Sequence, residues 1–286
     1  MKRLTVLIAF SLLATGSGVA QSDFLIVRER VISEILDTPV DDQLVFHLMQ
    51  IIRQDGSWQG IDYDDLSNTG FEHSMHLANM VDLALAYNKQ GTGYYRSERV
   101  RQLLNRAMDY WCENDFICEN WWWNQIGTPR ALVTVLLVMG DELDPEIRRK
   151  MLPIIGRAHL DAPGARPGGD RIKIAGIAAR QALATGEAES FRQIMQVIND
   201  EIRFSTGDRG MQNDYSFHHR IDRVNNTVSY GLGYAQAFAE WAGYVEGTRY
   251  DFSAEQVEML VDYYLDGICK QMVYGIYPDK GVKNRS

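Results

Sequence analysis

The stretch HSMHLANMVDLALAYNK, residues 73–89, places apolar side chains at the i, i+3 and i+4 spacing of an amphipathic helix. The same spacing recurs over residues 24–37, 41–54, 97–114, 127–140, 144–160, 172–185, 188–203, 230–245 and 253–272. No run of alternating polar and apolar residues bounded by turn residues competes with it. The sequence therefore predicts an all-α protein without a convincing sheet.

Helix boundary signals agree with this pattern. Pro129 and Pro145 stand where a first helical turn is expected, and Gly140 and Gly186 stand where C-terminal caps belong. Helices joined by short connections favour antiparallel helical hairpins wound side by side. We therefore expect an α/α toroid.

Composition limits the class of protein. The chain has 286 residues, of which 45% are hydrophobic and 23% charged, so it can bury a core and is not disordered. The formal net charge of −9 disfavours nucleic acid and anionic membranes as partners. An anionic ligand would need a local basic cluster.

The N-terminus has the layout of a secretory signal peptide. A basic Lys2-Arg3 start precedes an apolar run over residues 4–14 and small residues ending at Ala20. This pattern predicts a signal peptide over residues 1–20, a secreted or periplasmic protein and one domain over residues 21–286; a buried N-terminal helix is the alternative. Cys112, Cys118 and Cys269 lack the spacing of a zinc site, and the first two could be bridged or free.

Unusual side chains gather in the longer connections, over residues 55–70, 113–127, 161–171 and 205–227. Three consecutive tryptophans at 121–123 cannot all face one core, so we expect at least one to be exposed and suited to stacking on sugar rings. Residues 214–231 combine histidine, tyrosine and arginine, which suits proton transfer. A packing cluster and a solvated polar loop are the respective alternatives.

Several motifs together resemble the N-terminal helical domain of polysaccharide lyase family 8. They are DGSWQGIDY at 55–63, NWWWNQIGTPRAL at 120–132, PGGDRIKI at 167–174, DYSFHHR at 214–220, SYG at 229–231 and NRS at 284–286. Their order and spacing match the family from about residue 40 to the C-terminus, and the tryptophan motif is the most specific.

The resemblance implies an incomplete α/α toroid with a long cleft that cleaves an acidic, uronate-containing polysaccharide by β-elimination, with no cofactor and no metal. It implies that Trp121 and Trp122 form an aromatic patch that positions the sugar chain. It also implies that Tyr230 is the catalytic tyrosine and that Arg285 favours its ionised form.

Two positions depart from the family pattern. Asp170 stands where the family has an asparagine that binds the substrate carboxylate, so it must be protonated, paired with Arg171 or replaced in its role. Arg220 stands where the family has its histidine, so His219 is the candidate for that role and His218 the reserve.

The remaining expectations concern the cleft and the extent of the chain. Asn124 and Arg171 complete the predicted substrate-binding set. A group of arginines falls in segments that we expect to line the cleft, at positions 171, 209, 220, 223 and 285. Family members continue into C-terminal β domains, so the chain is expected to be a fragment or a minimal domain.

Two other functions remain open. The first is a catalytically inactive carbohydrate-binding homologue, which Asp170 favours. The second and weaker one is a hydrolase that uses two carboxylates, with Asp62, Asp64 and Asp65 as candidates, although acidic residues in such a loop more often face solvent.

Overall fold

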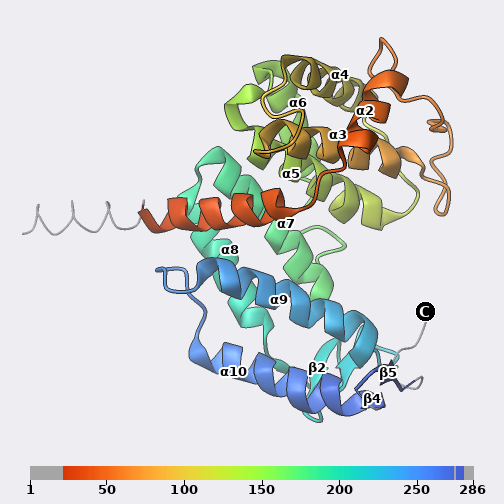
Figure 1. Cartoon of the computed structure of the whole chain (residues 1–286). Helices are drawn as coiled ribbons and strands as arrows, with labels where there is room; N and C mark the ends of the chain where they lie inside the picture. The colour runs from red at the N-terminus through yellow and green to blue at the C-terminus, as the bar shows by residue number, and fades with distance from the viewer. Residues whose placement is uncertain (1–21, 274, 280–286) are drawn as a thin grey trace, which may run out of the picture.

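The computed structural model describes residues 22–273 and 275–279 and confirms the predicted all-α class (Figure 1). A first helix covers residues 22–37. The other α-helices are α2 (Asp42–Ile51), α3 (His73–Asn88), α4 (Glu98–Asn114), α5 (Thr128–Met139), α6 (Pro145–Ile155), α7 (Gly169–Thr185), α8 (Ala188–Glu201), α9 (Leu232–Val245) and α10 (Ala254–Asp262). Shorter helical segments are the π-helical η1 (Trp123–Gly127), η3 (Thr227–Gly231) and η4 (Tyr263–Ile268) and the 3₁₀ segments η2 (Gly140–Glu142) and η5 (Cys269–Gln271).

The helices form an inner row and an outer row. In the inner row α3 packs against α5, α5 against α7 and α7 against α9, while α4, α6 and α8 each pack on the outside of the helix that precedes them. The inner row curves so that α3 and α9 line opposite walls of one cavity. This is the α/α toroid that the helical hairpins predict.

Two apolar clusters divide the core between the two halves of the chain. The first joins α2 to α6 with the start of α7, and the second joins α7 to η4. The helix over residues 22–37 contributes Phe24, Val27 and Val31 to the second cluster. At its side Arg30 donates hydrogen bonds to the carbonyl oxygens of Tyr244 at 2.8 Å and Glu246 at 2.7 Å. These hydrogen bonds hold the first helix against the C-terminal end of α9 (Figure 1).

The predicted helix boundary signals are confirmed. Pro129 and Pro145 lie in the first turns of α5 and α6, where the missing N–H costs no hydrogen bond. Gly140 and Gly186 follow α5 and α7 with φ of 53° and 81°, a region that glycine enters at little cost.

The prediction that no sheet is present is wrong for one segment of the chain. Strands β1 (Phe204–Ser205), β2 (Gly210–Gln212) and β3 (Phe217–His218) form a small sheet in which β2 pairs parallel to β1 and antiparallel to β3. Strands β4 (Met272–Val273) and β5 (Tyr277–Pro278) form a second antiparallel pair. Strands of two or three residues are too short for an alternating pattern to be visible.

Two further observations concern membranes and thiols. Among residues 22–273 and 275–279, no helix has the length and apolar character to cross a bilayer. Cys112, Cys118 and Cys269 are free thiols, so the bridge between the first two that the sequence left open is not formed.

Candidate functional site

Tyr230 and His219 lie face to face. Their ring centroids are 3.6 Å apart and their planes differ by 3°. Tyr230 belongs to η3 and keeps 39% of its surface exposed, and half-buried His219 follows β3. Two of the three predicted catalytic residues thus meet; the third, Arg285, lies outside the described residues.

A tight turn of the chain creates this contact. The Asn226 N–H donates to the Phe217 carbonyl at 2.8 Å, and the Phe217 N–H donates to the Thr227 hydroxyl at 2.9 Å. These bonds fold residues 218–225 back on themselves, so His219 returns to the start of η3. The reserve candidate His218 does not take part in the stack, and its Nδ1 is buried without a hydrogen-bond partner in the described part of the chain.

Cations surround the imidazole of His219. Burial, followed by the positive charges of nearby arginine and lysine side chains, lowers its pKa to about 4. The contributing cations are Arg209, Arg220, Lys173 and Arg166. His219 is therefore uncharged at neutral pH, with a ring nitrogen lone pair free to accept a proton.

Asp170 lies in the first turn of α7, is buried and has Arg209 as its partner. Their closest charged atoms, Oδ2 and Nη2, are 3.6 Å apart, and burial raises the pKa of the Asp170 carboxyl. Of the three alternatives for Asp170, pairing with Arg171 is not formed, because Arg171 faces Glu201 instead, with its Nε 3.5 Å from Oε2 of Glu201. Glu201 also accepts a hydrogen bond from the Gly168 N–H. Each arginine thus has its own acidic partner: Asp170 pairs with Arg209, and Glu201 pairs with Arg171.

Two nitrogens of Arg209 make no hydrogen bond. Its Nε and Nη2 are buried and have no hydrogen-bond partner among the described residues, and Nη2 has only the ion-pair contact with Asp170. Buried polar groups without partners are rare in proteins and cost free energy. An anionic group placed beside Arg209 would satisfy them, so this guanidinium is suited to holding a carboxylate.

The tryptophans form an aromatic patch beside the cations. All three are half-buried at the edge of the first core cluster, so the expectation that at least one would be exposed is wrong. The Trp121 ring packs on Gly164, where a Cβ atom would collide with it, and the Arg166 guanidinium lies 5.4 Å from its centroid. Trp122 and Trp123 meet edge to face at 5.0 Å. Arg166 thereby connects the patch to the cations around His219.

Asn124 has both amide atoms engaged within the chain. Its Oδ1 accepts from the Cys118 N–H at 2.9 Å, and its Nδ2 donates to the Cys118 carbonyl at 2.7 Å. It fixes the loop before the tryptophans. This contact gives Asn124 a positioning role, and its predicted contact with substrate stays a prediction.

The acidic loop of the hydrolase alternative is turned towards local backbone. Asp62 and Asp64 are exposed, and Asp62 accepts a hydrogen bond from the Asp64 N–H at 2.9 Å. Asp65 accepts from the Ser67 N–H at 3.0 Å. Such contacts are typical of turns. Within the described ranges, no group of three or more metal-binding side chains is assembled either.

Lys173 and Arg166 belong to the basic cluster but were not among the predicted site residues. Lys173 stands three residues after Asp170 on α7, so both lie on one face of the helix. That spacing could have identified Lys173. Arg166 offers no comparable signal, because its place beside Trp121 depends on two loops 45 residues apart.

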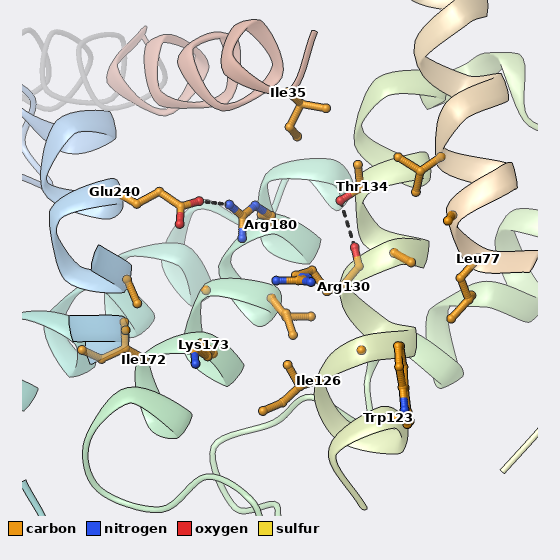
Figure 2. Close-up of a pocket in the computed structure, with 18 of the residues that line it drawn as sticks. Ile35, Leu77, Trp123, Ile126, Arg130, Thr134, Ile172, Lys173, Arg180 and Glu240 are labelled. Atoms are coloured by element: carbon orange, nitrogen blue, oxygen red, sulfur yellow. Dashed lines mark hydrogen bonds and ion pairs between the residues drawn. The ribbon is translucent and has the colours of Figure 1, made fainter. Parts of the chain in front are cut away.

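A cavity of about 670 Å³ opens between α3, α5, α7 and α9 (Figure 2). Trp123 of the aromatic patch and Lys173 of the basic cluster both line it. The cavity therefore adjoins the site that contains His219.

Comparison with known proteins identifies the family of this chain. The family model described as "Polysaccharide lyase family 8, N terminal alpha-helical domain" matches residues 40–286. Chondroitinase-AC of Pedobacter heparinus is 26% identical over 291 aligned residues, which include all of this chain and 41% of that protein. The chain thus spans about two fifths of the length of this relative.

Solved structures of lyases share the fold of this chain. A chondroitinase AC lyase studied with bound oligosaccharides superposes with a TM-score of 0.80 at 26% identity, covering 87% of this chain and 37% of that one. A Streptomyces coelicolor A3 chondroitin AC lyase (TM-score 0.73, 92% of this chain and 37% of that one) and a Paenibacillus xanthan lyase (TM-score 0.72, 92% and 27%) share the fold at 16% identity. The chain belongs to polysaccharide lyase family 8, and residues 40–286 match its N-terminal α-helical domain.

Proposed function

We propose that this chain is the helical catalytic part of a lyase that cleaves a uronate-containing, glycosaminoglycan-like polysaccharide by β-elimination. The observation that carries the proposal is an uncharged His219 that is stacked on Tyr230 and lies near four cations. The membership of the chain in polysaccharide lyase family 8 supports the reaction type.

The proposed reaction needs a base, an acid and a stabilised anion. His219 removes the proton from the carbon next to the uronate carboxylate, and the electrons of that C–H bond form a carbon–carbon double bond. The glycosidic C–O bond on the neighbouring carbon breaks, and the Tyr230 hydroxyl protonates the departing oxygen. Cations near the carboxylate stabilise the enolate-like intermediate.

We assign the carboxylate of the substrate to Arg209. The Arg209 nitrogens that make no hydrogen bond support this role, and Lys173 and Arg166 lie close enough to act on the same charges. Asp170 then positions Arg209 instead of contacting the substrate. A bound carboxylate would also offset the cations that lower the pKa of His219, which makes the imidazole a stronger base once substrate is present.

Export is part of the proposal. Residues 1–20 lie outside the described residues, and their sequence pattern supports a secreted or periplasmic location, where a polysaccharide would be met. Arg285 is proposed to act near Tyr230 on the strength of the sequence motif alone.

The test is product formation from chondroitin, followed by the ultraviolet absorbance of the unsaturated uronate. Tyr230→Phe should abolish the product. Tyr264→Phe is the matched control, because Tyr264 is 48% exposed on η4 and lies outside the site. Product formation by Tyr230→Phe at the unaltered rate would overturn the assigned role.

A non-catalytic carbohydrate-binding protein is the second candidate, and Asp170 in place of the family asparagine favours it. Calorimetry with uronate oligosaccharides separates the two. Binding that depends on Trp121 and Trp122, with no unsaturated product from the full-length protein, would support the second candidate and reject the first.

A further inference from the structure

The cavity between the inner helices contains a set of charges that the reaction does not use. Neither His219 nor Tyr230 lines it. Its walls come from α3, α5, α7 and α9, with Ile35 of the first helix at one end and Trp123 at another (Figure 2). The cavity is thus a separate compartment that shares Lys173 with the proposed reaction site.

One ion pair in this cavity is complete. Arg180, with 13% of its side chain exposed, pairs with Glu240 of α9, and its guanidinium lies 5.3 Å from the centroid of the Trp241 ring. The Tyr244 hydroxyl donates a further hydrogen bond to Glu240 at 3.3 Å. The Glu240 carboxylate is therefore already engaged.

Arg130 is a second cation that lines the cavity; its side chain is exposed, and it has no such partner in the described part of the chain. No carboxylate of the described residues lies within ion-pair distance of its guanidinium, and Figure 2 shows it in the space beside Arg180. The walls of the cavity and the like charge of Arg180 lower the pKa of Arg130. Asp82 also lines the cavity, and burial raises the pKa of its carboxyl.

We propose that this cavity is an anion site, in which Arg130 and Arg180, with Lys173 at the edge, bind the sulfate or carboxylate group of an acidic saccharide. Planar guanidinium groups match both anions with paired hydrogen bonds. The apolar side chains of Ile126, Ile172 and Trp123 line the cavity beside these cations. The site would hold a charged substituent away from the reacting groups.

The experiment follows tryptophan indole N–H resonances of the full chain during titration with inorganic sulfate and, separately, with glucuronate. Trp123 and Trp241 line the cavity, whereas Trp58 and Trp111 are buried elsewhere and report on the integrity of the fold. We expect saturable shifts of the two cavity resonances. Sulfate alone would identify a sulfo group as the ligand, and binding of glucuronate as well would identify a carboxylate; both results support the site.

Two arginine-to-glutamine substitutions, each removing one positive charge, test whether the anion binds at Arg130. Arg130→Gln should weaken sulfate binding at least about tenfold, because it removes a charge-assisted hydrogen-bonding group. Arg149→Gln removes the same charge from an exposed position on α6 and should leave the affinity unchanged. Arg130→Lys keeps the charge without the planar fork and should give an intermediate loss, which preserves the test if Arg130→Gln fails to fold.

Two results would overturn the proposal. One is the absence of any saturable shift with either anion. The other is a loss of binding in Arg209→Gln together with unchanged binding in Arg130→Gln, which would place the anion at the reaction site. Tyr230→Phe should leave sulfate binding unaltered, so a failure of the proposed reaction and a failure of this site are distinguishable.

Discussion

Replacing Gly231 by alanine should destabilise the fold, because this glycine sits where η3 meets η4. A Cβ atom at Gly231 would collide with the Tyr263 hydroxyl oxygen and lie 2.8 Å from Cβ of Phe217. Phe217 is 1% exposed and Tyr263 0% exposed, so neither side chain has space to move away. Gly231 also follows Tyr230, so the strain falls next to the proposed acid.

The size of the effect follows from two opposing contributions. Overpacking of a filled core costs about 1–3 kcal/mol. The better helix propensity of alanine returns at most about 1 kcal/mol. We therefore expect Gly231→Ala to lower the free energy of unfolding by up to about 2 kcal/mol.

Urea denaturation followed by circular dichroism measures this free energy. Gly243→Ala is the matched control: Gly243 is exposed on α9, and nothing lies within 4 Å of an added Cβ, so this variant should be stabilised by up to about 1 kcal/mol. Adding Tyr263→Phe to Gly231→Ala removes the colliding hydroxyl and should recover part of the loss. Equal stabilities of Gly231→Ala and Gly243→Ala would refute the packing argument.

Three further predictions concern histidines. Tyr63→Phe should cost about 1–3 kcal/mol in the same urea assay, because the Tyr63 hydroxyl bonds His76 Nδ1 at 2.8 Å and accepts from the Trp58 N–H at 3.0 Å. Burial lowers the pKa of His76 to about 3, so the unfolded chain takes up a proton first and stability should fall as pH drops from 6.5 towards 3; a flat profile would contradict this. Arg209→Gln removes a positive charge near His219 and should raise the pKa of His219 above about 4 in an NMR titration; an unchanged value would mean that Arg209 does not contribute to the shift.

Much of the helical architecture could be predicted from the sequence. The predicted helix over residues 73–89 is α3, and the one over residues 188–203 contains α8. Apolar periodicity, Pro129 and Gly186 are local signals, and local signals report where a helix lies. The π-helical turns at Trp123 and Tyr230 and the small sheet at Gly210 escaped prediction, because each depends on how the chain packs rather than on its own spacing.

The candidate site was predictable in part. The motif around Tyr230 pointed to this region, but the choice between His218 and His219 needed the turn that stacks one of them on the tyrosine. For Asp170 the sequence left three alternatives open: protonation, pairing with the neighbouring Arg171, or replacement in its role. Its ion-pair partner is Arg209, 39 residues further along the chain.

The sequence by itself determined an all-α protein, the order of its helices and the segments that carry unusual chemistry. Only the tertiary structure decided which charges meet: Arg209 with Asp170, Arg166 with Trp121, and Arg180 with Glu240 while Arg130 stays unpaired among the described residues. The physical reason is the range of the interactions. A helix forms through hydrogen bonds four residues apart, whereas an ion pair between two loops depends on the packing of every helix between them.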